Sequence, residues 1–246
     1  MILVATYNIW FDPKYILERS RLIIKEILGQ SNLIDIISFQ EVTEITLEYF
    51  LKSPLNKIYN FSKTKLKQSY DTLIIWRKTL KLNNYYNFAF SNSKMGRGLE
   101  IVSLQNLSGK TYLIGTSHLE SEFKTYSVKL EQFNTIFKTL QKYSKNHDLT
   151  IFCGDTNIIE DHNTTFNIPD GWNDVFLTIK PPKNLKWTYD HQMNDNVSFK
   201  KKARLDRIYY LNNTSITPNS FSFLGQEPSS EGIYQSDHFG VVTSFS

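Results

Sequence analysis

Residues 149–157 read LTIFCGDTN, an apolar run that passes directly into a polar cluster. The run is short and rich in β-branched and aromatic residues, which is typical of a buried strand. Gly154 ends it, and Asp155 and Asn157 follow at once. Polar groups at the ends of buried strands lie at the rim of a sheet, where functional sites are often built. We therefore treat Asp155 and Asn157 as candidate site residues.

Other apolar stretches along the chain end in the same way. They deliver, in chain order, Asn8, then Gln40 with Glu41, then His118 with Glu120 and Ser121, then Asp206, and finally Asp237 with His238. Any one of these ends has an ordinary structural explanation, since Glu41 could cap a helix and His238 could be a buried core histidine. These five ends and the one at Asp155 together indicate a site built from many strand ends on one rim.

The segments between these ends alternate between strand and helix patterns. Asp12-Pro13 predicts a helix start with Asp12 as the N-cap, and Gly29 predicts its end. Asn106 to Gly109 predicts a hairpin. Further helices are expected at 43–51 and 124–145, and strands at 34–39, 72–76, 99–104, 111–116, 205–211 and 239–245. Residues 52–69 are expected to be loop with short strand pieces. Strands interleaved with a few long helices predict an α/β (α+β) fold, with residues 1–246 forming one domain.

Bulk properties narrow the class of protein. No apolar run is long enough for a membrane span, and the N-terminus lacks the basic segment of a signal peptide. The only cysteine, Cys153, is expected to be a buried structural thiol, which fits an intracellular protein. The net charge of +4 permits a polyanionic partner without requiring one.

The candidate residues suit the hydrolysis of a phosphodiester. A hard cation such as Mg²⁺ prefers carboxylate oxygens, and Glu41 is the best candidate ligand. Asp155 is suited to orienting and deprotonating an attacking water. Histidine and amide groups can bind the phosphate oxygens as charge develops. Zinc is disfavoured, because one cysteine and scattered histidines do not form a closed N/S ligand set.

Four motifs resemble the endonuclease/exonuclease/phosphatase superfamily. They are Thr6-Tyr7-Asn8, Phe39-Gln40-Glu41, Gly154-Asp155-Thr156-Asn157 and Ser236-Asp237-His238. The segment 116–121 (TSHLES) is similar to the tyrosyl-DNA phosphodiesterase 2 branch, as are Trp187-Thr188-Tyr189-Asp190 and Arg204-Leu205-Asp206-Arg207. The resemblance extends from Thr6 to Val242, so we expect a catalytic domain without an appended recruitment domain.

This resemblance implies a four-layer αββα sandwich of two mixed sheets, as in DNase I-like proteins. It also implies hydrolysis of the bond between a DNA 5′-phosphate and a topoisomerase-type tyrosine, with Mg²⁺ as cofactor and Mn²⁺ as a substitute. By analogy, Glu41 holds the metal, Asp155 activates water and Asp206 orients His238. Asn8 supports the metal and the phosphate, and the phosphate is bound by Asn157, His118, Ser121 and His238.

The expected partner is a DNA 5′ end that carries a tyrosine adduct, bound by a monomer without membrane contact. Tyr70, Trp187 and Tyr189 are the aromatic candidates at the terminal nucleotide, and Arg97 lies in a matching segment. Lys200, Lys201, Lys202 and Arg204 are either further phosphate contacts or a solvated loop. His147, His162 and His191 are expected on the surface.

Three departures from the branch affect substrate shape more than reaction type. The branch usually continues its first motif with Ile-Asp-Gly, whereas here Ile9 is followed by Trp10-Phe11-Asp12. Ile158-Ile159 stands for Leu-Arg, and Tyr189 stands where a tryptophan is usual. Two alternatives stay open: another nuclease of the superfamily, such as an abasic-site endonuclease, and an inactive binding module of the same fold.

Overall fold

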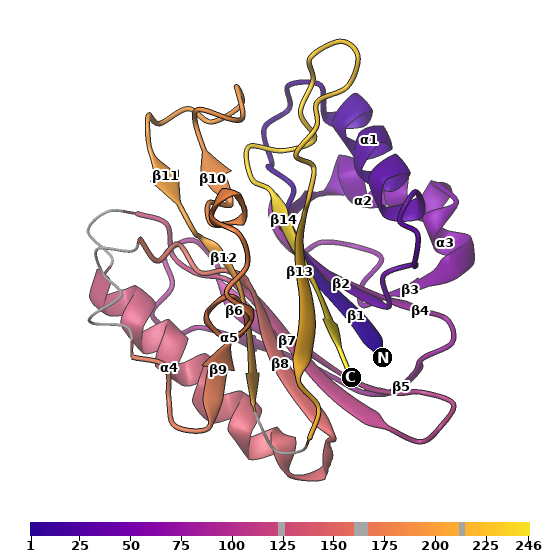
Figure 1. Cartoon of the computed structure of the whole chain (residues 1–246), viewed down its shortest axis with the longest axis vertical. Coiled ribbons are helices and arrows are strands. Elements are labelled where there is room, and N and C mark those ends of the chain that lie inside the picture. The colour runs from indigo at the N-terminus through magenta and orange to yellow at the C-terminus, as the bar shows by residue number, and fades with distance from the viewer. Residues whose placement is uncertain (123–125, 160–166, 212–214) are drawn as a thin grey trace.

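Two six-stranded mixed sheets pack face to face, and helices cover the outer face of each (Figure 1). The computed structural model describes residues 1–122, 126–159, 167–211 and 215–246. The layers run from α1, α2 and α3 through the first sheet and the second sheet to α4. The expected αββα sandwich is therefore confirmed.

The first sheet has the order β13-β14-β1-β2-β4-β3. Its central strands β1 and β2 run parallel, so their carboxyl ends lie on the same edge. The strands span Ile2–Asn8 (β1), Ile36–Thr43 (β2), Tyr59–Phe61 (β3), Tyr70–Arg77 (β4), Pro218–Leu224 (β13) and Gly240–Phe245 (β14). The chain termini lie side by side because Ile2 of β1 pairs with Phe245 of β14.

The second sheet has the order β5-β6-β7-β8-β12-β9, with β7 and β8 parallel. Its strands span Lys81–Ala89 (β5), Gly98–Gln105 (β6), Thr111–His118 (β7), Leu149–Asp155 (β8), Trp172–Asp174 (β9) and Asp206–Leu211 (β12). A separate short ribbon pairs Tyr189–Asp190 (β10) with Lys202–Ala203 (β11). The ribbon leads directly into β12.

The helices span Ile16–Leu28 (α1), Glu44–Lys52 (α2), Leu55–Ile58 (α3), Tyr126–Tyr143 (α4) and Val175–Ile179 (α5). Short 3₁₀ turns lie at Ser144–Asn146 (η1) and Lys183–Leu185 (η3). Thr43 caps α2, as its hydroxyl accepts a hydrogen bond from the Thr46 N–H, and this start agrees with the predicted helix at 43–51.

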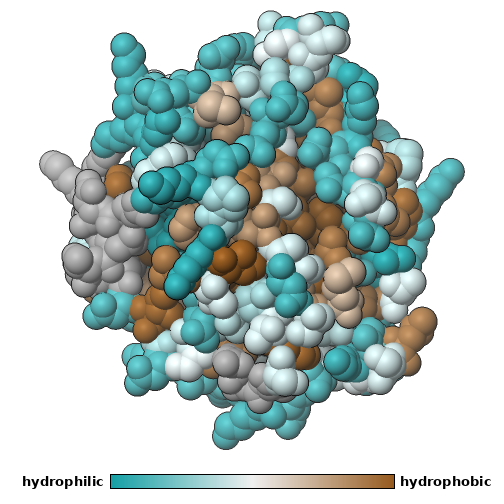
Figure 2. Space-filling view, viewed as in Figure 1, coloured by the Kyte–Doolittle hydropathy of each residue, from teal (hydrophilic) through white to brown (hydrophobic). Residues whose placement is uncertain are grey.

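The central strands are apolar on both faces because each strand lies between two apolar layers. In β8, Ile151 and Cys153 face the layer between the sheets, while Phe152 packs with Phe137 of α4. Burial on both sides produces the near-continuous apolar run seen in the sequence. Each fully buried side chain of this size contributes roughly 1.5–3 kcal/mol to folding. The surface is mainly hydrophilic where the core is apolar, and Figure 2 shows hydrophilic side chains over most of the visible outline.

The predicted start of the first helix at Asp12 is wrong. α1 begins at Ile16, and the Asp12 carboxylate instead accepts a hydrogen bond from the Lys14 N–H at 2.7 Å, an Asx-type turn. Arg19 holds the preceding loop in place by donating to the carbonyls of Ile9, Trp10, Asp12 and Lys14. Those carbonyls are therefore bound outside any helix.

The remaining predictions locate most elements within a few residues. The hairpin at Asn106 joins β6 to β7, and α4 covers most of the helix expected at 124–145, although Lys124 lies outside the described residues. Strands β5, β9, β10, β11 and β13 were not predicted. Residues 52–69 contain β3, one of the short strand pieces expected there, and the helical turn α3, which was not expected. In the described part of the chain, no helix is long and apolar enough to cross a membrane.

Candidate active site

Strand register brings the polar strand ends together at one rim. His118 of β7 pairs with Asp155 of β8, and Asp155 pairs on its other side with Asp206 of β12. In the facing sheet, Asn8 ends β1 beside Gln40 of β2. The two sheets contact each other here, because the Asn8 amide donates to Asp155 Oδ2 at 2.9 Å.

Asp155 is the centre of this group. Its Oδ1 accepts from the Asn157 N–H at 2.9 Å, and its Oδ2 lies 3.4 Å from His118 Nε2 and 3.9 Å from His238 Nε2. Burial opposes ionisation, but the two histidines and the hydrogen bonds from Asn8 and Asn157 outweigh it, so the pKa of Asp155 lies below its usual value. Asp155 is therefore a carboxylate at neutral pH.

His238 forms a tight pair with Asp206, at 2.7 Å between Nδ1 and Oδ2. Burial acts to lower the pKa of His238, and the charges of Asp206 and Asp237 outweigh it and raise that pKa well above the usual value. Ser236 Oγ accepts from the His238 N–H at 3.1 Å and donates to the Asn8 carbonyl at 2.7 Å. His238 is thus held as an imidazolium at a fixed position.

His118 differs in charge from His238. Burial and then the Arg97 charge lower the pKa of His118 to about 3, so this imidazole is neutral. Its buried Nδ1 has no hydrogen-bond partner among the described residues and lies 3.9 Å from Glu41 Oε1. The site therefore offers one neutral and one cationic imidazole on the same carboxylate.

Glu41 is placed by unusual backbone geometry. Its φ of 61° is left-handed, which a residue with a side chain adopts only when the surroundings hold it there. The Phe11 N–H donates to Glu41 Oε2 at 2.9 Å. Burial raises the pKa of Glu41 to about 7, and the neighbouring Asp237 adds to this rise. Burial likewise raises the pKa of Asp237 to about 6.

These buried carboxylates fit a hard divalent cation, which prefers oxygen ligands and relieves the repulsion between like charges. Burial disfavours the ionised forms of Glu41 and Asp237, and a bound cation would favour them. Among the described residues, Asp155, Asp206 and His238 also have ligand atoms within 4.8 Å of one another. His238 Nδ1 is already bound by Asp206, so Glu41 and Asp237 are the better candidates for the metal.

Aromatic and basic groups line the rim beside Glu41. Tyr70 of β4 stacks on Phe11 with ring centroids 4.8 Å apart and planes at 11°, and the Arg97 guanidinium lies 5.2 Å from the Tyr70 ring centroid. Tyr189 contacts the His238 ring edge-on at 5.2 Å, while Trp187 is half-buried. Tyr70 and Trp187 are half-buried and remain candidates for substrate contact, whereas Arg97 and Tyr189 are buried at 6% and 8% exposure.

Ser121 and Asn157 lie differently from the residues around Asp155. Ser121 is exposed, and its hydroxyl contacts Met95 Sδ at 3.4 Å. Asn157 adopts a left-handed φ of 49°, and its side-chain amide donates to the Leu119 carbonyl at 3.0 Å. This bond leaves the carboxamide oxygen of Asn157 available.

The position of Arg204 does not fit the predicted contact with DNA. Its side chain is only 5% exposed and forms a 2.7 Å ion pair with Asp174, which is also buried. A guanidinium held in this way stabilises the packing of β9 against the loop before β12. Lys202 pairs with Asp190 at 3.0 Å, so within the lysine run Lys200 and Lys201 are the exposed members.

Several residues that support the site were named within the sequence motifs but were given no role there. The Thr188 hydroxyl accepts from the N–H groups of Leu205 and Asp206, and Ser236 ties His238 to Asn8. The Glu120 carboxylate binds Ser93 Oγ and the N–H groups of Lys94 and Met95. Each of these residues lies within or beside a motif, and that proximity was the only signal for them.

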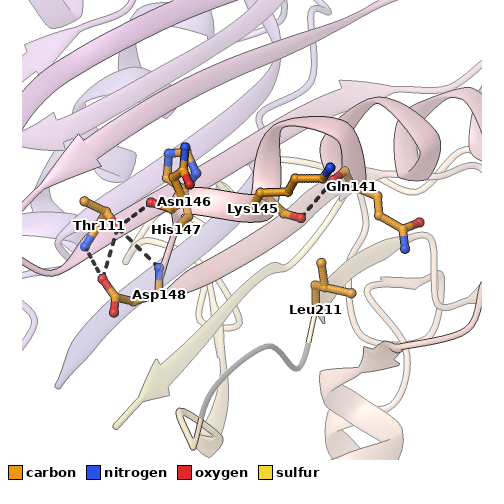
Figure 3. A pocket seen from close by; sticks show the side chains of 8 residues that line it. Thr111, Gln141, Lys145, Asn146, His147, Asp148 and Leu211 are labelled. Carbon is orange, nitrogen blue, oxygen red and sulfur yellow. Dashed lines mark hydrogen bonds between the residues drawn. The ribbon is translucent and has the colours of Figure 1, made fainter.

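A hollow at the opposite end of β7 is a less suitable site. It is lined by Thr111, Gln141, Ser144, Lys145, Asn146, His147, Asp148 and Leu211 (Figure 3). Asp148 accepts from Thr111, so the polar groups bind one another rather than converge on a space. His147 is half-buried and bonds Ser103 at 2.7 Å, so its predicted surface position is only partly right. His191 is also half-buried, and His162 lies outside the described residues.

The paired sheets and the acidic rim define a class of proteins. Residues 5–238 match the Endonuclease/Exonuclease/phosphatase family, and the chain belongs to it. Within this family it falls in the tyrosyl-DNA phosphodiesterase 2 branch. It is 31% identical to Tyrosyl-DNA phosphodiesterase 2 of Homo sapiens over 250 residues, covering 98% of this chain and 67% of that protein.

Two further comparisons support the branch. The chain is 30% identical to Tyrosyl-DNA phosphodiesterase 2 of Rattus norvegicus over 213 residues, which covers 85% of this chain and 57% of that protein. The crystal structure of D. rerio TDP2 complexed with single strand DNA product matches with a TM-score of 0.88 at 25% identity, covering 100% of this chain and 98% of that one. The chain thus spans little more than half the length of the rat relative.

Proposed function

We propose that this protein hydrolyses the phosphodiester between a DNA 5′ end and a tyrosine, with Mg²⁺ or, as a substitute, Mn²⁺ as cofactor. The observation that carries the proposal is the convergence of Glu41, Asp155, His118 and His238 at one rim. The branch to which the chain belongs, and a relative bound to a single-strand DNA product, support the substrate class.

The residues divide the chemistry between them. Asp155 is ionised, so it can orient a water and accept its proton as the oxygen attacks phosphorus. His238 is protonated and His118 neutral, so both can donate to non-bridging oxygens as negative charge builds. The phosphorus–oxygen bond to tyrosine then breaks, which releases a phenolate and leaves a 5′-phosphate.

The metal and the leaving group lower the barrier in different ways. A divalent cation held by Glu41 and Asp237 would neutralise charge on the phosphate and its attacking or leaving oxygen. The tyrosine hydroxyl has a pKa of about 10, so a phenolate is a better leaving group than a sugar alkoxide. Neither effect requires the protein to form a covalent intermediate. We also propose a monomer in an intracellular location, which the lone reduced thiol of Cys153 supports.

A substrate comparison tests the reaction. We expect faster Mg²⁺-dependent cleavage of a 5′-phosphotyrosyl oligonucleotide than of an abasic duplex of the same sequence. Asp155→Asn should lower kcat by about 100-fold or more, and Glu41→Gln should weaken Mg²⁺ binding measured by calorimetry. Glu48→Gln, an exposed residue paired with Lys52, is the matched control.

Two outcomes would favour the alternatives. Preference for the abasic duplex would point to another nuclease activity of the family. An absence of metal-dependent hydrolysis, together with no effect of Glu41→Gln on Mg²⁺ binding, would support an inactive binding module.

A further inference from the structure

Phe11 is an exposed aromatic residue at the edge of the candidate site. Its side chain is 46% exposed, although its backbone N–H is bound to Glu41 at 2.9 Å. Because of that bond, the backbone of the residue that carries the ring is fixed to the carboxylate that the proposed function assigns to the metal. Phe11 belongs to the segment where the sequence departs from the branch, since Trp10-Phe11-Asp12 follows Ile9 in place of Asp-Gly.

The loop that carries Phe11 is fixed from inside the protein. The Arg19 side chain is 2% exposed and donates to the carbonyls of Ile9, Trp10, Asp12 and Lys14, on both sides of Phe11. Its guanidinium also lies 4.6 Å from the Trp10 ring centroid, which holds Trp10 at its left-handed φ of 60°. The Phe11 ring is therefore presented on a preorganised loop, so a ligand that contacts it loses little entropy in ordering it.

Phe11 changes which aromatic surface is open to a ligand. The Phe11 ring covers one face of Tyr70, and the Arg97 guanidinium also contacts the Tyr70 ring. Tyr70 is half-buried, so the open aromatic face at this part of the rim belongs to Phe11. An exposed aromatic ring is a surface on which the bases of single-stranded nucleic acid stack.

We propose that Phe11 is a stacking surface for a base of the DNA strand whose 5′-phosphate enters the site. The inference rests on the proposed function for its substrate, but it concerns a residue to which the family motifs assign no role. Stacking places the base on the outer face of Phe11, and Tyr70, whose ring the Arg97 guanidinium contacts, supports the Phe11 ring from behind. The contact accepts any base, because every base has an aromatic face.

The experiment compares Phe11→Ala with the wild-type protein in two measurements. The first is binding of a fluorescent 5′-phosphorylated single-stranded oligonucleotide, measured by anisotropy. The second is KM for the 5′-phosphotyrosyl oligonucleotide. We expect both constants to rise about fivefold or more in Phe11→Ala, and to return to near the wild-type value in Phe11→Trp. The Phe11 N–H is retained in both variants, so the bond to Glu41 is not removed.

Abasic nucleotides identify the contacted base. The effect of Phe11→Ala is measured on oligonucleotides that carry one abasic residue at position 1, 2 or 3. The full effect should remain when the abasic residue lies away from the contacted base, and it should largely disappear when the contacted base is the one removed. The control is Phe88→Ala, another exposed phenylalanine that stacks on a tyrosine, here Tyr86, but that also packs against Tyr143 of α4. An undiminished effect on every abasic substrate would overturn base stacking and point to the tyrosine leaving group or to loop structure.

The two proposals can fail separately. Wild-type hydrolysis with equal constants for Phe11→Ala would overturn the stacking inference alone. DNA binding that depends on Phe11 without any hydrolysis would overturn the proposed function alone. Absence of measurable binding to single-stranded DNA by the wild-type protein would overturn both.

Discussion

Three buried groups at the centre of the site hold different charges although they share one environment. Asp155 is ionised, His238 is protonated and His118 is neutral. Burial opposes the charged form of each, so hydrogen-bond and charge partners decide the outcome. His238 has Asp206 at 2.7 Å, whereas His118 has no partner on Nδ1 among the described residues. Asp206 is thus the residue that gives the two histidines different protonation states.

Asp206→Asn tests this separation. An amide keeps the size of the side chain but removes the charge that holds His238 protonated and in one orientation. We expect kcat for the phosphotyrosyl substrate to fall by about 100-fold or more, with a smaller change in KM. Asp148→Asn, which also removes a carboxylate bound to backbone and hydroxyl groups, is the remote control. Equal losses in the two variants would contradict a specific role for Asp206.

At the scale of elements, prediction succeeded where local signals agree with the fold. The apolar run before Asp155 and the helix expected at 43–51 depend on neighbouring residues, and they appear as β8 and α2. The helix start at Asp12 was wrong because Arg19, seven residues away, binds the loop carbonyls. β5 was missed because its Asn-rich, largely exposed sequence lacks the pattern of a buried strand.

The same reasoning separates predictable site residues from the others. A carboxylate after an apolar strand can be recognised locally, and register then brings Asp155, Asp206 and His118 together. The partner of Arg204 could not be predicted, because Asp174 is 30 residues away in sequence. The stack of Phe11 on Tyr70 likewise depends on how the loop after β1 meets the start of β4 at the rim.

Glu120, in the segment after β7, organises the loop that carries Arg97. Its carboxylate accepts from Ser93 Oγ, from the N–H groups of Lys94 and Met95, and from Gln132 Nε2. Burial acts to raise the pKa of Glu120, but these bonds outweigh it and lower that pKa. The loop is thus stabilised by the ionised form of Glu120.

Glu120→Gln should weaken this loop, because the new amide group faces N–H donors on either side. We expect the free energy of unfolding to fall by about 1–2 kcal/mol, and KM for DNA to rise while kcat changes less. A lowered pKa gives stability that is present above the unfolded value of about 4.3 and is lost as pH falls through the folded value. The difference between wild type and variant should therefore be constant at neutral pH and shrink below about pH 4.

The control for this variant is Glu131→Gln on the exposed face of α4, which should leave the free energy of unfolding nearly unchanged. Urea titrations between neutral and acidic pH measure the difference directly. A difference that grows as the solution is acidified would contradict the assigned role of Glu120.

At the scale of the whole molecule, the layer between the two sheets links the site to the rest of the core. Asn8 comes from the first sheet and Asp155 from the second, so their 2.9 Å hydrogen bond depends on how the sheets pack. Two residues before Asp155 in β8, and in the same layer between the sheets, the Cys153 thiol donates to Ser38 Oγ of β2 at 3.3 Å. Cys153 therefore reports on the packing that also forms the site.

Cys153 should be inert towards thiol reagents until the sheets separate. Burial raises the pKa of its thiol to about 12, so almost no reactive thiolate exists at pH 8 in the folded protein. Its place between the sheets also blocks access, so local fraying at a strand end does not expose it. We expect the rate of maleimide labelling to rise with urea in parallel with global unfolding measured by circular dichroism. Rapid labelling in buffer alone would mean that the sheets separate at the site without unfolding, and the pairing of Asn8 with Asp155 could not then be a fixed feature of the active centre.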